Sequence, residues 1–245
     1  MIRSELRWAL RSSILPALII SACVLTAVAI YGTVKGLPAN STPSVLQADQ
    51  VTENLVGLGF GGYLLSVVYG SYIGARDFGN QAVIRRSFLA NGQGRLLLVK
   101  TVALSVPAIL FGIVGAVAAV VTVDVTMRAY GLDFEWSPDT TKILMGVIVA
   151  IAVMTYIGMF VGWLCRRLTM AIVILVAYTV VIESALLGIL PKICRFLPGG
   201  AISAITLDAG FSARLPMWGG YLTLIGWLVV LLGICLARSK YSDLG

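Results

Sequence analysis

The chain has 245 residues, of which 59% are hydrophobic and only 12% are charged, and its mean hydropathy is +0.96. A soluble protein carries about 25% charged residues, so this composition excludes an ordinary soluble globular protein. The 26 glycines and 8 prolines show no period, and four scattered cysteines are too few for a disulfide scaffold. The composition therefore indicates one integral membrane domain over residues 1–245.

Six apolar stretches are long enough to cross a bilayer, because a membrane helix needs about 20 mostly apolar residues. Their expected bounds are approximately 14–34, 56–74, 101–122, 143–164, 170–190 and 217–236. A β-barrel is rejected, since barrel strands alternate polar and apolar residues, whereas residues 143–153 are apolar on every side. We therefore expect an all-α membrane protein with six transmembrane helices.

The basic residues predict the orientation of the chain. If the N-terminus is cytoplasmic, twelve of the eighteen Lys and Arg residues fall inside: Arg3, Arg7, Arg11, Arg76, Arg85, Arg86, Arg95, Lys100, Arg166, Arg167, Arg238 and Lys240. The positive-inside rule then places both termini of a multi-pass membrane protein in the cytoplasm. The net charge of +7 is thus a topology signal, and no nucleic-acid binding is expected because no basic soluble face is present.

Residues 1–13 have the pattern of an amphipathic helix that lies on the cytoplasmic leaflet. Apolar side chains share one face of this helix and basic side chains line the adjoining face. The basic residues are Arg3, Arg7 and Arg11, and Trp8 is expected at the level of the lipid headgroups. A merely basic segment beside the membrane remains the alternative.

The chemistry of catalysis is missing from the sequence. The chain has no histidine, which removes His-based acid-base catalysis and most zinc and haem ligation. It has no GxxxxGK[ST] phosphate-binding loop, and its longest segments between spans, 75–100 and 191–216, are too short for a nucleotide-binding domain. We therefore expect no enzyme activity, no metal and no cofactor in this chain, so that any ATP and Mg would be bound by a partner.

The segment 75–100 predicts a stiff cytoplasmic elbow. Asp77 can cap a short helix with apolar positions on one side and arginines that face water or phosphate. The run Asn-Gly-Gln-Gly at 91–94 then ends this helix before the third span. Arg95 and Lys100 then lead the chain into the third span. The alternative is a positive-inside anchor that has no partner.

The elbow resembles that of permease subunits of ABC exporters of the second, six-span class, relatives of bacteriocin-, antibiotic- and multidrug-exporting permeases. In that family an acidic-aromatic pair leads into a helix, a turn, an Arg and a Lys, and the pair is Asp77-Phe78 here. The usual Gly-Thr after the pair is replaced by Gln81-Ala82. The segments 196–205 and 237–244 are similar to the family's short extracytoplasmic re-entrant helices and to its charged tail.

This resemblance implies a homodimer, or a pair with a similar permease, that carries one ABC ATPase subunit under each half. The N-terminal helix and the elbow would dock on the ATPase, which binds ATP and Mg. The coupling residues that the resemblance implies are Asp77, Phe78, Arg85, Arg86, Arg95 and Lys100. Short helices containing Pro198, Gly199 and Gly200 would form an extracytoplasmic gate. The expected cargo is hydrophobic or amphipathic, such as a bacteriocin, another peptide antibiotic, a drug or a lipid, and the expected outcome is multidrug or bacteriocin resistance.

Glu183 is the only ionisable residue well inside an expected span. A charge at the centre of a membrane helix costs about 2.5–3.5 kcal/mol on insertion scales, so Glu183 is a candidate for the translocation pathway, with Tyr178 on the same face. It could pair with Lys192 or Arg195, or contact a cationic substrate. A carboxylate that snorkels near the end of the helix is the alternative.

Two glycine pairs, Gly70 with Gly74 and Gly158 with Gly162, have the four-residue spacing that lets helices approach closely. Packing within the bundle is their expected role, since such pairs locate no pathway by themselves.

Two other classes of function remain open. A self-contained secondary transporter would usually show paired broken helices and several charges within the membrane. A membrane anchor or sensor would give no ATP-dependent flux even with its partner present. A neighbouring reading frame with a phosphate-loop motif would favour the ABC interpretation.

Overall fold

The computed structural model describes residues 2–35, 52–79, 82–129, 136–207 and 215–243, and within these ranges the chain is helical and has no strand. The long helices are α2 (Ile14–Lys35), α4 (Tyr63–Gly79), α6 (Gln93–Ala129), α7 (Pro138–Cys165) and α12 (Met217–Asp243). The shorter ones are α1 (Ile2–Arg11), the 3₁₀ helix η1 (Leu58–Gly62), α5 (Ala82–Ala90), α8 (Leu168–Val176), the π-helix η2 (Ala177–Ile182), α9 (Glu183–Ile189), α10 (Pro191–Cys194) and α11 (Pro198–Ile205).

Four helices, α2, α6, α7 and α12, are long and apolar enough to cross a membrane. The expectation of a multi-pass, all-helical membrane protein agrees with these four. The expected spans at 56–74 and 170–190 are also helical, but each is divided: η1 precedes α4, and η2 separates α8 from α9. The number of crossings therefore stays at four candidates, and six remains a prediction.

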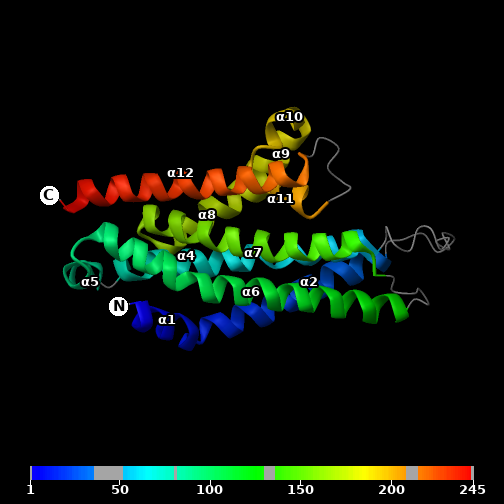
Figure 1. Ribbon diagram of the computed structural model, residues 1–245, viewed down its shortest axis with the longest axis horizontal. Helices are drawn as coiled ribbons and strands as arrows, with labels where there is room; N and C mark the ends of the chain where they lie inside the picture. Colours follow the sequence, from blue (N-terminus) through cyan, green and yellow to red (C-terminus); the bar gives the residue numbers. More distant parts are fainter. Residues whose placement is uncertain (1, 36–51, 80–81, 130–135, 208–214, 244–245) are drawn as a thin grey trace.

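The closest packing in the bundle is between α4 and α7, which run side by side (Figure 1). A Cβ atom on Gly70 or Gly74 would collide with the backbone of α7 at Thr155 and Met159. A Cβ atom on Gly158 of α7 would collide in turn with the backbone of α4. Glycine at these positions lets the two backbones touch, so the expected role of the glycine pairs in packing within the bundle is confirmed.

Local sequence signals explain where several helices begin and end. Ser137 caps α7, because its hydroxyl accepts a hydrogen bond from the Thr140 amide while the Thr140 side chain reaches back to the Ser137 amide. The elbow turns at Asn91 and Gly92, which both have positive φ angles (58° and 120°). The predicted end of the short helix before the third span is therefore confirmed, and α6 begins directly after Gly92.

The two ends of the bundle carry different elements. The start of α1, α5 and the end of α12 lie together at one end (Figure 1). Toward the other end, α11 packs on α7 where Gly146 leaves room for the carbonyl of Ile205. The elbow thus lies at one end of the bundle, and α10 and α11 lie toward the other (Figure 1).

Candidate functional site

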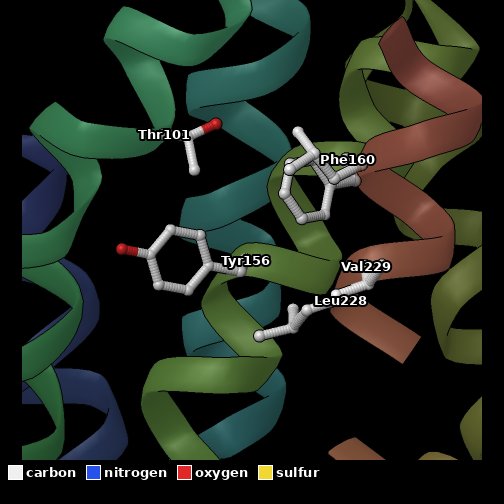
Figure 2. A pocket seen from close by; sticks show the side chains of 6 residues that line it. Thr101, Tyr156, Phe160, Leu228 and Val229 are labelled. Atoms are coloured by element: carbon white, nitrogen blue, oxygen red, sulfur yellow. The ribbon is translucent and has the colours of Figure 1, made fainter. Parts of the chain in front are cut away.

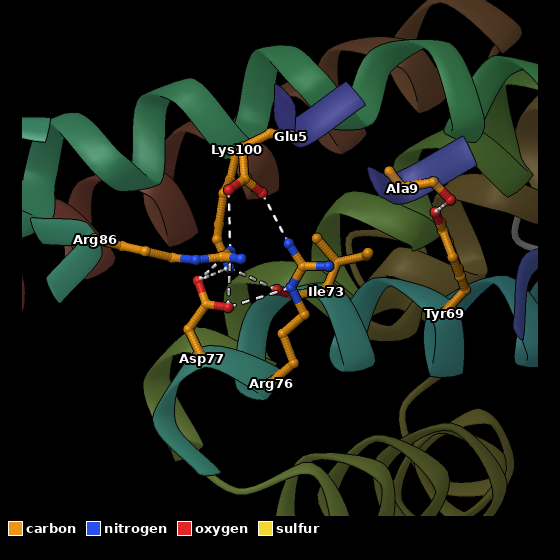
Figure 3. Close-up of polar contacts among 8 residues, drawn as sticks. All are labelled: Glu5, Ala9, Tyr69, Ile73, Arg76, Asp77, Arg86 and Lys100. Carbon is orange, nitrogen blue, oxygen red and sulfur yellow. Dashed lines mark hydrogen bonds and ion pairs between the residues drawn. The ribbon is translucent and has the colours of Figure 1, made fainter. Parts of the chain in front are cut away.

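A buried ion pair anchors the elbow to the bundle (Figure 3). Asp77, near the end of α4, is only 3% exposed, and the Nζ of Lys100 on α6 lies 2.7 Å from its Oδ2. Lys100 also donates a hydrogen bond to the carbonyl of Ile73 at 3.0 Å. A buried charge is tolerated only when it is paired and hydrogen-bonded. The end of α4 and the start of α6 are therefore held beside each other, and these are the two ends that α5 connects.

Glu5 of α1 extends the pair into a cluster that joins four helices. Its carboxylate lies 2.8 Å from Nη2 of Arg76 and 3.0 Å from Nη1 of Arg86. The same two arginines contact Asp77, Arg76 through Nε at 3.2 Å and Arg86 through Nη1 at 3.1 Å. Three cations therefore surround two carboxylates, and α1, α4, α5 and α6 are tied together at this end of the bundle.

Aromatic contacts reinforce the attachment of α1. The guanidinium of Arg76 lies over the ring of Trp8, 3.0 Å from its centroid, and Trp8 stacks on Tyr72. One turn earlier on α4, the hydroxyl of Tyr69 donates to the carbonyl of Ala9 at 3.2 Å (Figure 3). Trp8 is 36% exposed and at the same time packs on α4. A headgroup anchor alone would not need this packing.

The electrostatics of the cluster keep its carboxylate charged. Burial alone would raise the pKa of Asp77, but the positive charges of Lys100, Arg76 and Arg86 outweigh the burial and hold this pKa below its ordinary value. Asp77 is thus an anion at neutral pH, and its charge is neutralised by cations of the same chain.

The structure brings together three of the six predicted coupling residues, namely Asp77, Arg86 and Lys100. The residues just before the short helix, 80 and 81, lie outside the described residues, so the expected cap by Asp77 stays a prediction. Arg86 is turned toward the two carboxylates instead of toward water or phosphate. Phe78 packs edge-on against Trp163 inside the bundle, with ring centroids 5.1 Å apart.

Arg85 and Arg95 are exposed and make none of the contacts of the cluster. Sequence reasoning missed Glu5 and Arg76 as members. One signal for Glu5 was present in the sequence. It lies four residues before Ala9, on the apolar side of the helix, and residues at this spacing share a helical face. For Arg76, the adjacent Asp77 was the only hint.

The tip of the elbow presents apolar side chains to the outside. On α5, Phe88 is 79% exposed and Leu89 is 70% exposed, and Ile84 is more than half exposed. Arg85 lies among them and is also exposed. Val83 and Ala90 face the bundle and are buried. The short helix therefore has one face packed on the bundle and one apolar, basic-edged face that nothing in the described part of this chain covers.

The N-terminal helix α1 has the expected amphipathic character. Arg3, Arg7 and Arg11 are all exposed, whereas Ala9 is buried against the bundle. The helix α1 begins at the same end of the molecule as α5 (Figure 1).

At the other end of the bundle, Glu183 caps a helix. It is 7% exposed, and its Oε1 accepts a hydrogen bond of 2.6 Å from the amide of Gly199 in the first turn of α11. A Cβ atom on Gly199 would collide with this carboxylate, so any other residue at this position would require the Glu183 side chain to move. A carboxylate at a helix N-terminus satisfies free amides and interacts favourably with the helix dipole. Pro198, the first residue of α11, fits the same position because its missing amide costs nothing there.

The expected ion pair of Glu183 with Lys192 or Arg195 is not among the ion pairs of the described residues. The thiol of Cys194 instead approaches the backbone carbonyl of Glu183 at 3.8 Å. The hydroxyl of Tyr178 is buried, and no hydrogen bond is found for it within the described ranges. Gly200 allows α11 to lie against the carbonyl of Cys194.

Over the part of the chain that the structure describes, no three His, Cys, Asp or Glu residues are grouped as metal ligands. The chemistry available at both ends is thus that of charge pairing and helix capping, which position helices relative to one another.

Comparison with known proteins identifies no relative. No model of a protein family matches the chain, and neither a curated protein nor a solved structure does. Assignment of a function therefore depends on the physical argument from the elbow and its surroundings.

Proposed function

We propose that this chain is the membrane-spanning permease subunit of an ATP-driven ABC transporter that exports a hydrophobic or amphipathic substrate. In this proposal two copies of the chain, or the chain and a similar permease, form the pathway in the bacterial plasma membrane. Two ABC ATPase subunits bind ATP and Mg on the cytoplasmic side. Both termini and α5 face these subunits.

Six crossings are supported by the lengths of the divided helices. Together η1 and α4 span residues 58–79, and α8, η2 and α9 span residues 168–189. Each unit has about 22 residues, which is enough to cross the hydrocarbon layer at 1.5 Å per residue. The π-helix in the second unit fits a proposed role near the pathway, because π-bulges are frequent at functional sites.

The observation that carries the proposal is the combination of a buried ion pair at the base of the elbow with exposed apolar side chains at its tip. The buried Asp77–Lys100 pair fixes its base, while Phe88 and Leu89 at its tip are exposed. Exposed apolar side chains on a rigid helix favour a protein partner, and topology alone requires neither the buried pair nor the apolar tip. A rigid, partner-facing lever is what transmission of an ATP-driven movement needs.

The cluster also supports a role for α1 in the same lever. Glu5 contacts arginines of both α4 and α5, so that a force applied to α5 is shared with α1. At the opposite end, the Glu183–Gly199 contact fixes α11, which the proposal assigns to the extracytoplasmic gate. Under this proposal Glu183 positions the gate helix and need not touch the cargo.

The test is co-purification with the ATPase encoded by a neighbouring reading frame that contains a phosphate-loop motif, followed by ATPase measurement in lipid. The double substitution Phe88→Ser and Leu89→Ser should abolish co-purification while the permease remains folded. Trp218→Ser, at a 68% exposed aromatic of α12 far from α5, is the matched control. Equal ATPase binding by both variants, or cargo movement by the purified chain alone, would contradict the proposal.

A further inference from the structure

An apolar groove lies between α6, α7 and α12 (Figure 2). It has a volume of about 180 Å³ and is lined by Thr101, Tyr156, Phe160, Leu228, Val229 and Leu232. All three helices that form it are candidate membrane spans. Val229 in its lining is 63% exposed, so the groove lies at the surface of the described bundle.

The few polar atoms around the groove are already used. The Thr101 hydroxyl donates to the carbonyl of Leu97 at 2.9 Å, and the Tyr156 hydroxyl donates to Ser105 at 2.9 Å. The lining thus offers no free donor to a polar ligand, and a water molecule would lack the two to four polar partners that it needs. An aliphatic chain is the ligand that such a lining accepts.

Basic residues lie at the end of the helices toward which a lipid headgroup would extend from the groove. Lys240 is on the groove-facing side of α12, because it follows Val229 by eleven residues, or about three turns. It is exposed and lies about 12 Å along the helix from Leu232. Gly94 at the start of α6 lies close to Leu236 of α12, so the exposed Arg95 is at the same end.

These depths correspond to the two parts of a phospholipid. One leaflet has about 15 Å of hydrocarbon below its headgroups. With Lys240 at the headgroup level, the α12 residues that line the groove lie about 12–18 Å deeper along the helix, so the groove extends from the acyl layer of that leaflet to the middle of the bilayer. A transmembrane helix of a second copy, about 10 Å across with its side chains, is too wide to enter a groove of this size.

We propose that this groove binds one acyl chain of an anionic phospholipid in the leaflet on the α5 side, with the lipid phosphate at Lys240. The proposal concerns lipid binding by the chain itself and does not depend on an ATPase partner or on transport.

The experiment is native mass spectrometry of the full chain in detergent, titrated with dioleoyl-phosphatidylglycerol or dioleoyl-phosphatidylcholine. Phosphatidylglycerol should bind more tightly. Lys240→Gln should weaken its binding about fivefold, which corresponds to about 1 kcal/mol per basic residue, and leave phosphatidylcholine unchanged. Lys35→Gln, at an exposed lysine of α2 at the far end of the bundle, is the control and should change neither lipid.

Filling the groove tests the acyl chain separately. Val229→Trp should weaken binding of both lipids about fivefold through lost chain contacts, whereas Ile234→Trp, on a different exposed face of α12, should not. If Val229→Trp fails to fold, Leu232→Phe replaces it. Equal binding of the two lipids without an effect of Lys240→Gln would overturn the proposal. So would efficient crosslinking of two Val229→Cys chains in the membrane, because a second copy would then cover the groove.

Discussion

Removal of the Asp77 charge should destabilise the protein far more than removal of an equally short surface pair. Asp77→Asn leaves Lys100 as an unpaired cation that is 1% exposed. Breaking a buried pair by removing one partner costs about 3–5 kcal/mol in the free energy of unfolding. The pair of Lys142 with Asp139 has nearly the same length, 2.6 Å against 2.7 Å, but its side chains are 58% and 51% exposed. Asp139→Asn should therefore cost less than about 1 kcal/mol.

The assay is reversible unfolding in detergent micelles, followed by circular dichroism, for both single variants and for a double-mutant cycle at Asp77 and Lys100. The combined variant Asp77→Asn with Lys100→Met should recover most of the lost stability, because it leaves no buried charge unpaired. If Asp77→Asn and Asp139→Asn shift the midpoint equally, the cluster does not hold the elbow and the reasoning fails.

Three further outcomes are expected. Gly158→Ala should destabilise the chain by about 1–3 kcal/mol through collision with α4, whereas Gly226→Ala, which meets nothing within 4 Å, should be neutral or stabilising in the same unfolding assay. Because folding lowers the pKa of Asp77, its charge contributes to the free energy of unfolding in full above pH 3.8, the ordinary value of this pKa. This contribution is lost as the pH falls through the lower pKa of the folded state. The unfolding midpoint of Asp77→Asn should therefore fall less steeply in acid than the midpoint of the natural chain. Gly199→Ala should displace the Glu183 carboxylate and loosen α11, which faster hydrogen exchange of the α11 amides would reveal, and unchanged exchange would refute the cap.

The burial of Asp77 changes how docking of the elbow has to be tested. From the sequence, Asp77→Ala or Phe78→Ala is expected to leave folding intact while detaching the ATPase. The structure places both side chains against the bundle, so these variants would mix lost stability with lost docking. Phe88 and Leu89 are the sharper choice, since little of either side chain is buried.

Apolar periodicity and turn residues allowed the helical class and most helix positions to be predicted. The stretch 143–164 became α7 because Ser137 and Pro138 supply the cap before it. The elbow could be predicted because Asn91 and Gly92 tolerate positive φ. The subdivision of the expected spans at 56–74 and 170–190 could not be predicted, since an apolar run carries no signal that distinguishes α from 3₁₀ or π hydrogen bonding.

The sequence by itself determined that this protein is helical and apolar, that its basic residues gather beside the expected spans, and that the segment 75–100 contains a short helix and a turn. Only the tertiary structure decided which charges meet, because Glu5 lies 71 residues from Arg76 and 81 from Arg86 along the chain. The same holds for Glu183, whose partner is a backbone amide of α11 that no side-chain pattern indicates. Local pattern predicts an element, whereas the low-dielectric interior selects the partner of each buried charge once the helices have packed.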